Sequence, residues 1–223
     1  MVCLIKLVIL DLDQTLIDTI HRFHLVFNMM LEEHGAPQVD WPRFIRMYSD
    51  DTLDQLIPGD SRSFWVEFRR RYCSVAHPLD RAYYGAGRAL EWLRERRLRA
   101  AVTTGRECRP ADVWRELEQH GLAHLVDSVL TMADCSEEDE LTWSRTGLIR
   151  LALGHFGVDS SEAVFVGDYW VDMESARRAG VHPVAVRTGF EPEHRLLKHG
   201  AKAVLAGIWE LPSYLRQVLE SST

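Results

Sequence analysis

Short runs of β-branched and other apolar residues recur along the chain, and stretches with helical periodicity separate them. The runs are Leu4–Leu10, Leu98–Thr103, Val126–Met132, Ala163–Val166, Pro183–Val186 and, more weakly, Ala203–Leu205. The helical stretches include Gly87–Arg96, Pro110–His120, Thr146–Phe156, Val171–Ala179, Glu193–His199 and Ile208–Leu219. Strands that alternate with helices form parallel sheets whose two faces are covered by the helices. The sequence therefore predicts an α/β fold with a parallel sheet.

One interval, from about Thr19 to about Tyr83, interrupts this alternation because it shows helical patterning and no convincing strand. Its helical segments are Ile20–Glu33, Trp41–Tyr48 and Arg62–Val75. A connection between a strand and a helix usually takes only a few residues. We therefore predict an inserted all-helical cap domain of residues 19–83, and an α/β core formed by residues 1–18 and 84–223.

Charge and hydropathy exclude several classes of partner. The 26 Lys and Arg residues against 33 Asp and Glu residues give a formal net charge of −7, so we expect neither nucleic acid nor an anionic membrane surface as a partner. No apolar run approaches the roughly 18 residues of a membrane span. Four scattered cysteines form no C-x-x-C pair and are interpreted as free thiols. We expect a soluble cytoplasmic protein.

Acidic and hydroxyl side chains follow three of the predicted strands. Asp11 and Asp13 come after the first run, Thr103 and Thr104 end the second, and the fourth ends in Gly167-Asp168, with Asp172 four residues further on. Ligands of open α/β sheets bind outside the carboxyl ends of the strands. We therefore expect these side chains to meet at one edge of the sheet.

Carboxylates held close together repel one another unless a cation neutralises them. Magnesium binds oxygen ligands, usually one or two carboxylates together with water or phosphate oxygens. We expect Mg²⁺ to be held by Asp11, Asp168 and the backbone carbonyl of Asp13, with Asp172 as a further ligand or as support for one.

In this pattern the chain resembles the haloacid dehalogenase superfamily of aspartate-nucleophile hydrolases, in the branch that includes phosphoglycolate phosphatase. The resemblance covers essentially the whole length. The family motif D-x-D-x-T is matched at Asp11, Asp13 and Thr15, and G-D-x-x-x-D at Gly167, Asp168 and Asp172. A hydroxyl residue that closes a strand is matched at Thr103, although Thr104 leaves the register open. The resemblance implies a Rossmann-like core with a small helical cap.

The resemblance also implies a mechanism. Asp11 would attack phosphorus to give an aspartyl-phosphate, and Asp13 would protonate the leaving alcohol and later deprotonate the attacking water. Mg²⁺ would stabilise the charge of the transition state. Thr103, together with loop N–H groups, would hold the phosphoryl oxygens. Asp13 favours a phosphate ester over a haloacid, because attack on carbon releases no alkoxide that needs a proton.

Two positions depart from the family pattern. Trp143 stands where the family has a lysine that bridges nucleophile and phosphate, and no lysine occurs between Lys6 and Lys198. We predict that Arg145 replaces this lysine; the alternative is a surface charge at the start of a helix. Gln14 stands where a glycine commonly follows the second aspartate.

These features predict a Mg²⁺-dependent phosphatase for a small phosphorylated metabolite. The alternatives are a catalytically weakened relative that binds phosphate or a protein partner, and a phosphomutase. The residues that select the substrate are expected in the cap, where Trp65, His77 and Arg69–Arg71 are candidates, although a solvated helix face is the preferred interpretation of the arginine run. The sequence carries no prediction of the substrate's identity or of the oligomeric state.

Overall fold

A six-stranded parallel sheet forms the centre of the protein in the computed structural model, which describes residues 5–135 and 143–220. The central strand β1 (Leu7–Asp11) lies between β4 (Arg99–Thr104) and β6 (Ala163–Gly167). The outer strands are β5 (Ser128–Thr131) beside β4, and β7 (His182–Val186) followed by β8 (Ala203–Leu205) beside β6. All pairs are parallel, so the carboxyl ends of the strands share one edge.

Helices cover both faces of the sheet, which explains the nearly continuous apolar character of the strands. Val8 and Leu10 of β1 pack towards α4 (Ala86–Glu95), α5 (Pro110–Gln119) and α9 (Leu211–Glu220). Leu7 and Ile9 point to the other face, where α6 (Thr146–Phe156), α7 (Trp170–Arg178) and α8 (Glu193–Lys198) lie. The predicted α/β fold is confirmed.

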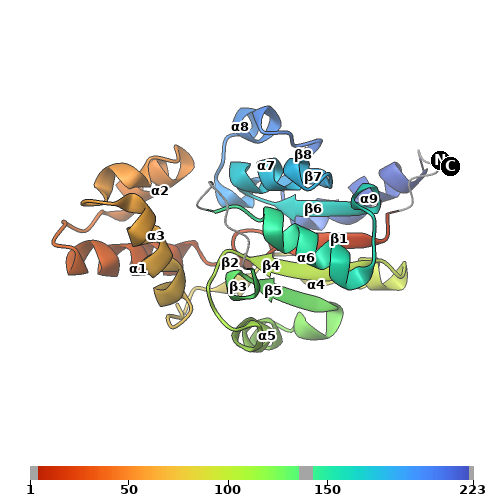
Figure 1. Cartoon of the computed structure of the whole chain (residues 1–223), viewed down its shortest axis with the longest axis horizontal. Coiled ribbons are helices and arrows are strands. Elements are labelled where there is room, and N and C mark those ends of the chain that lie inside the picture. The colour runs from red at the N-terminus through yellow and green to blue at the C-terminus, as the bar shows by residue number, and fades with distance from the viewer. Residues whose placement is uncertain (1–4, 136–142, 221–223) are drawn as a thin grey trace.

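A separate group of helices lies beyond the carboxyl ends of the strands (Figure 1). It contains α1 (Ile20–Glu33), α2 (Trp41–Ser49), a 3₁₀ turn at Leu53–Leu56, and α3 (Ser61–Tyr72). These helices bury their own apolar cluster, whose largest fully buried members include Phe27, Phe44, Phe64 and Phe68. An independent core of this kind agrees with the cap that we predicted, and the boundaries at residues 18/19 and 83/84 stay an interpretation.

The expectation that the insertion contains no strand is wrong at its end. β3 (Arg81–Ala82) pairs antiparallel with β2 (Ile17–Asp18), so the two segments that join cap and core run side by side. The amide of Tyr83 continues this contact by donating to the carbonyl oxygen of Leu16 at 2.9 Å. Two-residue strands are too short to show an alternating pattern, which is why the sequence did not indicate them.

Other boundaries differ from the predictions by a few residues. The predicted strand ending at Met132 stops at Thr131, and Met132 begins a 3₁₀ turn. The predicted helix Ile208–Leu219 divides into a 3₁₀ turn at Ile208–Glu210 and α9. Leu4, the predicted start of the first strand, lies outside the described residues.

Two further predictions concern membrane-spanning helices and the cysteines. No helix among them combines the length and the apolar character that a membrane crossing requires. Cys73, Cys108 and Cys135 are free thiols, and Cys3 lies outside the described residues.

Candidate active site

Three of the predicted carboxylates gather at the carboxyl edge of the sheet. Asp11 is the last residue of β1, Asp168 directly follows β6, and Asp172 lies in the first turn of α7. One oxygen from each lies within 4.8 Å of the others, and all three residues are buried. The hydroxyl of Thr15 donates to Asp168 at 3.3 Å. The parallel register therefore brings together acids that lie far apart in the sequence.

The electrostatics of this three-carboxylate cluster fit a hard cation. Burial raises the pKa of Asp11 and Asp168 well above the usual range, and neighbouring carboxylates raise both further. Asp172 Oδ1 is buried and, among the described residues, accepts no hydrogen bond. Two oxygens on opposite sides of an octahedral Mg²⁺ lie about 4.2 Å apart, because each bond is about 2.1 Å long. The carboxylate oxygens of the cluster lie within 4.8 Å of one another, so small side-chain movements would let them bind one such ion.

A glycine that the sequence analysis did not single out closes over this cluster. A Cβ atom at Gly189, in the loop after β7, would overlap the carboxylate of Asp168. The loop can approach the acid so closely only because the residue has no side chain. Its sequence signal was a glycine three residues beyond a predicted strand.

Arg145 lies directly against the nucleophile candidate. Its Nε donates to Asp11 Oδ1 at 3.2 Å and lies 3.8 Å from Asp172 Oδ1. Its Nη1 donates to the backbone carbonyl oxygen of Trp143 at 2.7 Å. A Cβ atom at Gly105 would lie 2.6 Å from Nη1, so a side chain there would displace the guanidinium. Arg145 is only 7% exposed, which is inconsistent with the alternative of a surface charge.

The carboxylate of Asp13 is separate from the three-carboxylate cluster. It accepts hydrogen bonds from Arg106 Nη2 at 2.6 Å and Nε at 2.9 Å, and from the hydroxyl of Thr19 at 2.7 Å. Burial works to raise the pKa of Asp13, but the guanidinium of Arg106 outweighs it and holds the pKa at about 2. Metal binding through the backbone carbonyl of Asp13 stays a prediction.

Arg106 had no role in the sequence analysis, although it follows Thr103-Thr104-Gly105 at a strand end. It pairs with Asp13 and with Glu116 of α5. Arg22 of α1 continues the chain of charges, because its Nη2 lies 2.6 Å from Glu116 and 2.6 Å from Asp80. This buried network joins the cap to the core and ends at Asp13.

The structure distinguishes the two strand-end threonines. Thr103 is the partner of Asp11 in the β1–β4 register, so both side chains point to the same face of the sheet. Its hydroxyl lies 3.5 Å from the carbonyl oxygen of Leu10. Thr104 points to the other face, and its hydroxyl donates to Asp13 at 3.3 Å. A phosphate-binding role is therefore more consistent with Thr103, and Thr104 supports Asp13.

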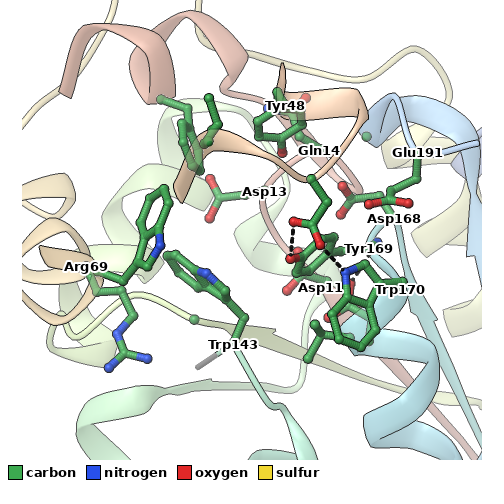
Figure 2. Close-up of a pocket in the computed structure, with 18 of the residues that line it drawn as sticks. Asp11, Asp13, Gln14, Tyr48, Arg69, Trp143, Asp168, Tyr169, Trp170 and Glu191 are labelled. Atoms are coloured by element: carbon green, nitrogen blue, oxygen red, sulfur yellow. Dashed lines mark hydrogen bonds between the residues drawn. The ribbon is translucent and has the colours of Figure 1, made fainter. Parts of the chain in front are cut away.

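A cavity of about 360 Å³ separates the cluster from the cap. Besides charged residues, its lining contains eight aromatic side chains: Phe23, Tyr48, Trp65, Phe68, Tyr72, Trp143, Tyr169 and Trp170. In Figure 2, Asp11 lies between Trp143 on one side and Trp170 and Asp168 on the other. Of the cap candidates, Trp65 and Arg69 line the cavity, whereas His77 stacks on His21, with ring centroids 5.6 Å apart. Arg70 and Arg71 form partly exposed ion pairs with Glu107 and Glu33, as a solvated helix face predicts.

Further contacts between cap and core lie around Asp51 and at the linkers. Asp51 of the cap accepts hydrogen bonds from Tyr169 Oη and Trp170 Nε1, both at 2.7 Å (Figure 2). At the linkers, Gln14 has φ of 59°. Its side-chain amide lies 2.7 Å from Tyr83 Oη and, on the other side, 2.7 Å from the amide nitrogen of Ile20. Gln14 therefore connects the segment that enters the cap with the segment that leaves it.

Comparisons with known proteins agree with this geometry. A family model described as haloacid dehalogenase-like hydrolase matches residues 8–186. An N-acetylmuramic acid 6-phosphate phosphatase of Pseudomonas aeruginosa is 28% identical over 96% of each chain. A plasmid-borne phosphoglycolate phosphatase of Cupriavidus necator is 28% identical over 93% of this chain and 92% of its own.

The solved structures show the same fold. That of a predicted phosphatase from Clostridium acetobutylicum superposes with a TM-score of 0.78 at 19% identity, over 96% of this chain and 99% of the other. The predicted resemblance and the prediction of a phosphoric monoester hydrolase are confirmed by the family match and by relatives named as phosphatases. The chain belongs to the haloacid dehalogenase-like hydrolase family.

Proposed function

We propose that the protein is a Mg²⁺-dependent phosphatase that hydrolyses a small phosphate monoester through an aspartyl-phosphate on Asp11. One observation carries the proposal: Asp11 lines the cavity while its carboxylate contacts Arg145 and belongs to the three-carboxylate cluster. Burial raises the pKa of Asp11, and only the ionised form is nucleophilic, so Arg145 and a bound cation together would keep this carboxylate ionised.

The side chains support the first chemical step. An Asp11 oxygen attacks phosphorus, the bond to the ester oxygen breaks, and the alcohol leaves towards the cap. Arg145 compensates the negative charge where nucleophile and phosphate approach each other, as the missing lysine would. Thr103 is proposed to donate to a phosphoryl oxygen from the neighbouring strand. Mg²⁺ bound to Asp11, Asp168, Asp172 and the backbone carbonyl of Asp13 would supply further stabilisation of the phosphoryl charge.

Asp13 is proposed to transfer protons in both steps. Arg106 keeps the pKa of Asp13 low, so Asp13 is ionised before the second step. In that step Asp13 accepts a proton from the water that hydrolyses the aspartyl-phosphate. In the first step it must donate a proton to the leaving oxygen. The arriving phosphate raises the pKa of a neighbouring carboxyl by like-charge repulsion, which favours the protonated form at that moment.

The relatives support a small metabolite as substrate, because their names specify phosphorylated sugars or acids. The missing lysine motivated the alternative of a weakened, phosphate-binding relative. The buried contact of Arg145 with Asp11 supplies a cation at the nucleophile and weakens that alternative.

Hydrolysis of p-nitrophenyl phosphate tests the proposal. We expect release of inorganic phosphate in MgCl₂, loss of activity in EDTA, and a fall in kcat of at least about 10³-fold in Asp11→Asn. Asp159→Asn, an exposed aspartate outside the cavity, is the matched control and should retain activity.

Acid quenching with a radiolabelled ester provides a second measurement. The wild type should retain label in an alkali-labile form, and Asp11→Asn should not. Absence of turnover across a panel of phosphate esters would support the binding alternative instead, and isomerised ester without free phosphate would support a phosphomutase.

A further inference from the structure

The wall of the cavity nearest the cap is built from aromatic rings that fix one another. The ring centroids of Trp65 and Trp143 lie 5.4 Å apart at an interplanar angle of 66°, and those of Phe68 and Trp143 lie 6.2 Å apart at 81°. Trp65 Nε1 donates to Asp54 at 2.6 Å, which sets the plane of its indole. Three rings from cap and core thus form a preorganised apolar surface, defined here as the aromatic wall.

The aromatic wall is connected to the nucleophile. The backbone carbonyl oxygen of Trp143 accepts from Arg145 Nη1, and the same guanidinium contacts Asp11 through Nε. In Figure 2 the indole of Trp143 lies on the same side of Asp11 as Asp13 does. An ester whose phosphorus lies at Asp11 and whose leaving oxygen lies near Asp13 therefore places its alcohol against the aromatic wall.

The polar groups of the lining call for hydrogen-bond donors rather than for further anions. On the side of the cavity where Asp168 lies (Figure 2), Glu191 is 5% exposed, and its Oε2 has no hydrogen-bond partner among the described residues. On the other side, Asp54 contributes a carboxylate beside the aromatic wall, where it accepts from Trp65. The cation beside the aromatic wall is Arg69. Its Nη2 lies 3.1 Å from Glu107 Oε1, and its guanidinium lies over the ring of Trp143. An additional carboxylate or phosphate on the substrate would meet mainly like charge.

The size of the cavity agrees with a ring. Pockets for drug-sized ligands measure roughly 300–1,000 Å³, and this one measures about 360 Å³. A two-carbon acid would leave the aromatic wall in contact with water, whereas the face of a sugar or nucleobase would cover it.

We infer that the alcohol released by this enzyme carries a ring with hydroxyl or amino donors, as in a sugar phosphate or a nucleoside monophosphate, and that Trp143 selects for this ring. The inference rests on the proposed function, since it names the substrate class of the same site. It assigns a specificity role to the tryptophan that stands in place of the family lysine.

Steady-state kinetics with three esters test the inference. Glucose 6-phosphate and adenosine 5′-monophosphate represent the two ring classes, and phosphoglycolate represents short acids. We expect kcat/KM to favour at least one ring ester over phosphoglycolate by at least about tenfold, the size of one stacked ring contact. The ester that is preferred identifies the ring class.

The variant Trp143→Leu separates ring recognition from catalysis. It should lower kcat/KM for the preferred ring ester at least about tenfold and that for phosphoglycolate by less than about threefold. Trp209→Leu, a partly exposed tryptophan outside the cavity, is the matched control and should change neither value. Preference for phosphoglycolate, or an equal loss for both kinds of ester in Trp143→Leu, would overturn the inference while leaving the phosphatase intact.

A binding measurement keeps the inference testable if no ester is hydrolysed. Glucose 6-phosphate and adenosine 5′-monophosphate are titrated into Asp11→Asn and into Asp11→Asn/Trp143→Leu, with tryptophan fluorescence and calorimetry as readouts. Tighter binding of a ring ester than of phosphoglycolate, lost with Trp143→Leu, supports the aromatic wall even if the proposed function fails. Equal binding of all three esters contradicts it.

Discussion

Replacing Arg145 by methionine removes the buried guanidinium but keeps a side chain of similar length. Arg145 Nε lies 3.2 Å from Asp11 and 3.8 Å from Asp172. At an effective dielectric constant of about 20, the closer pair alone attracts with about 5 kcal/mol, before the cost of desolvation. Removing one partner of a buried ion pair typically costs about 3–5 kcal/mol. We expect Arg145→Met to lower the free energy of unfolding by that amount near neutral pH in EDTA.

Magnesium should compensate part of this loss. The variant's three carboxylates keep their negative charge near neutral pH only at high cost, and a bound cation no longer meets the repulsion of the guanidinium. A ligand present at 100 times its Kd stabilises the folded state by about 2.7 kcal/mol. The rise in unfolding free energy on adding Mg²⁺ should therefore be larger in Arg145→Met than in the wild type.

Urea unfolding followed by circular dichroism, in EDTA and in excess MgCl₂, measures both effects. Arg88→Met, a change at an exposed arginine of α4, is the matched control and should change stability little. Equal stability of Arg145→Met and wild type in EDTA would show that the guanidinium does not neutralise the cluster. An identical Mg²⁺ response in both proteins would show that ion and guanidinium do not share these carboxylates.

Three further predictions concern groups around the site. Arg106→Gln should destabilise the protein at neutral pH, and the difference from wild type in urea unfolding should shrink as the pH falls from about 4 to 2. The pKa of Asp13 is about 2 in the folded protein, below its ordinary value of 3.8. The ion pair of Asp13 with Arg106 therefore stabilises the fold fully above pH 3.8, and this stabilisation is lost as the pH falls through about 2. Glu191→Gln should be as stable as the wild type below pH 4.5 and more stable above pH 7, by up to about 3 kcal/mol in urea unfolding. Burial raises the pKa of Glu191 from 4.5 to about 7, so the wild type loses stability as the pH rises through that window. A variant less stable than the wild type at about pH 8 would contradict this prediction. Gln14→Gly should speed hydrogen exchange at the start of α1, as measured by mass spectrometry, because the amide contact with Ile20 is lost. The free energy of unfolding should change by less than about 1 kcal/mol, because glycine adopts the left-handed backbone conformation of this position without strain. Unchanged exchange there would show that Gln14 does not hold the linkers.

The sequence by itself determined the order and type of the six strands of the main sheet and of the longer helices. The helices Ile20–Glu33 and Thr146–Phe156 have the predicted bounds, because long apolar periodicity specifies a helix locally. The central strands were predictable since residues buried on both faces give apolar runs, and the acids at their ends follow directly in the chain. The positions of Asp11, Asp168 and Asp172 at the site were therefore predictable from the chain alone.

Tertiary structure alone decided which cation meets Asp13. Arg106 and Asp13 lie 93 residues apart in the chain, whereas Arg145 was expected beside Asp11 only through the family resemblance. No local pattern predicts such a pair, because its energy arises only when the folded sheet and cap exclude water between the charges. The aromatic wall has the same origin. The sequence singled out Trp65 and Trp143 separately, and only the folded cap brings their rings together at the edge of the sheet.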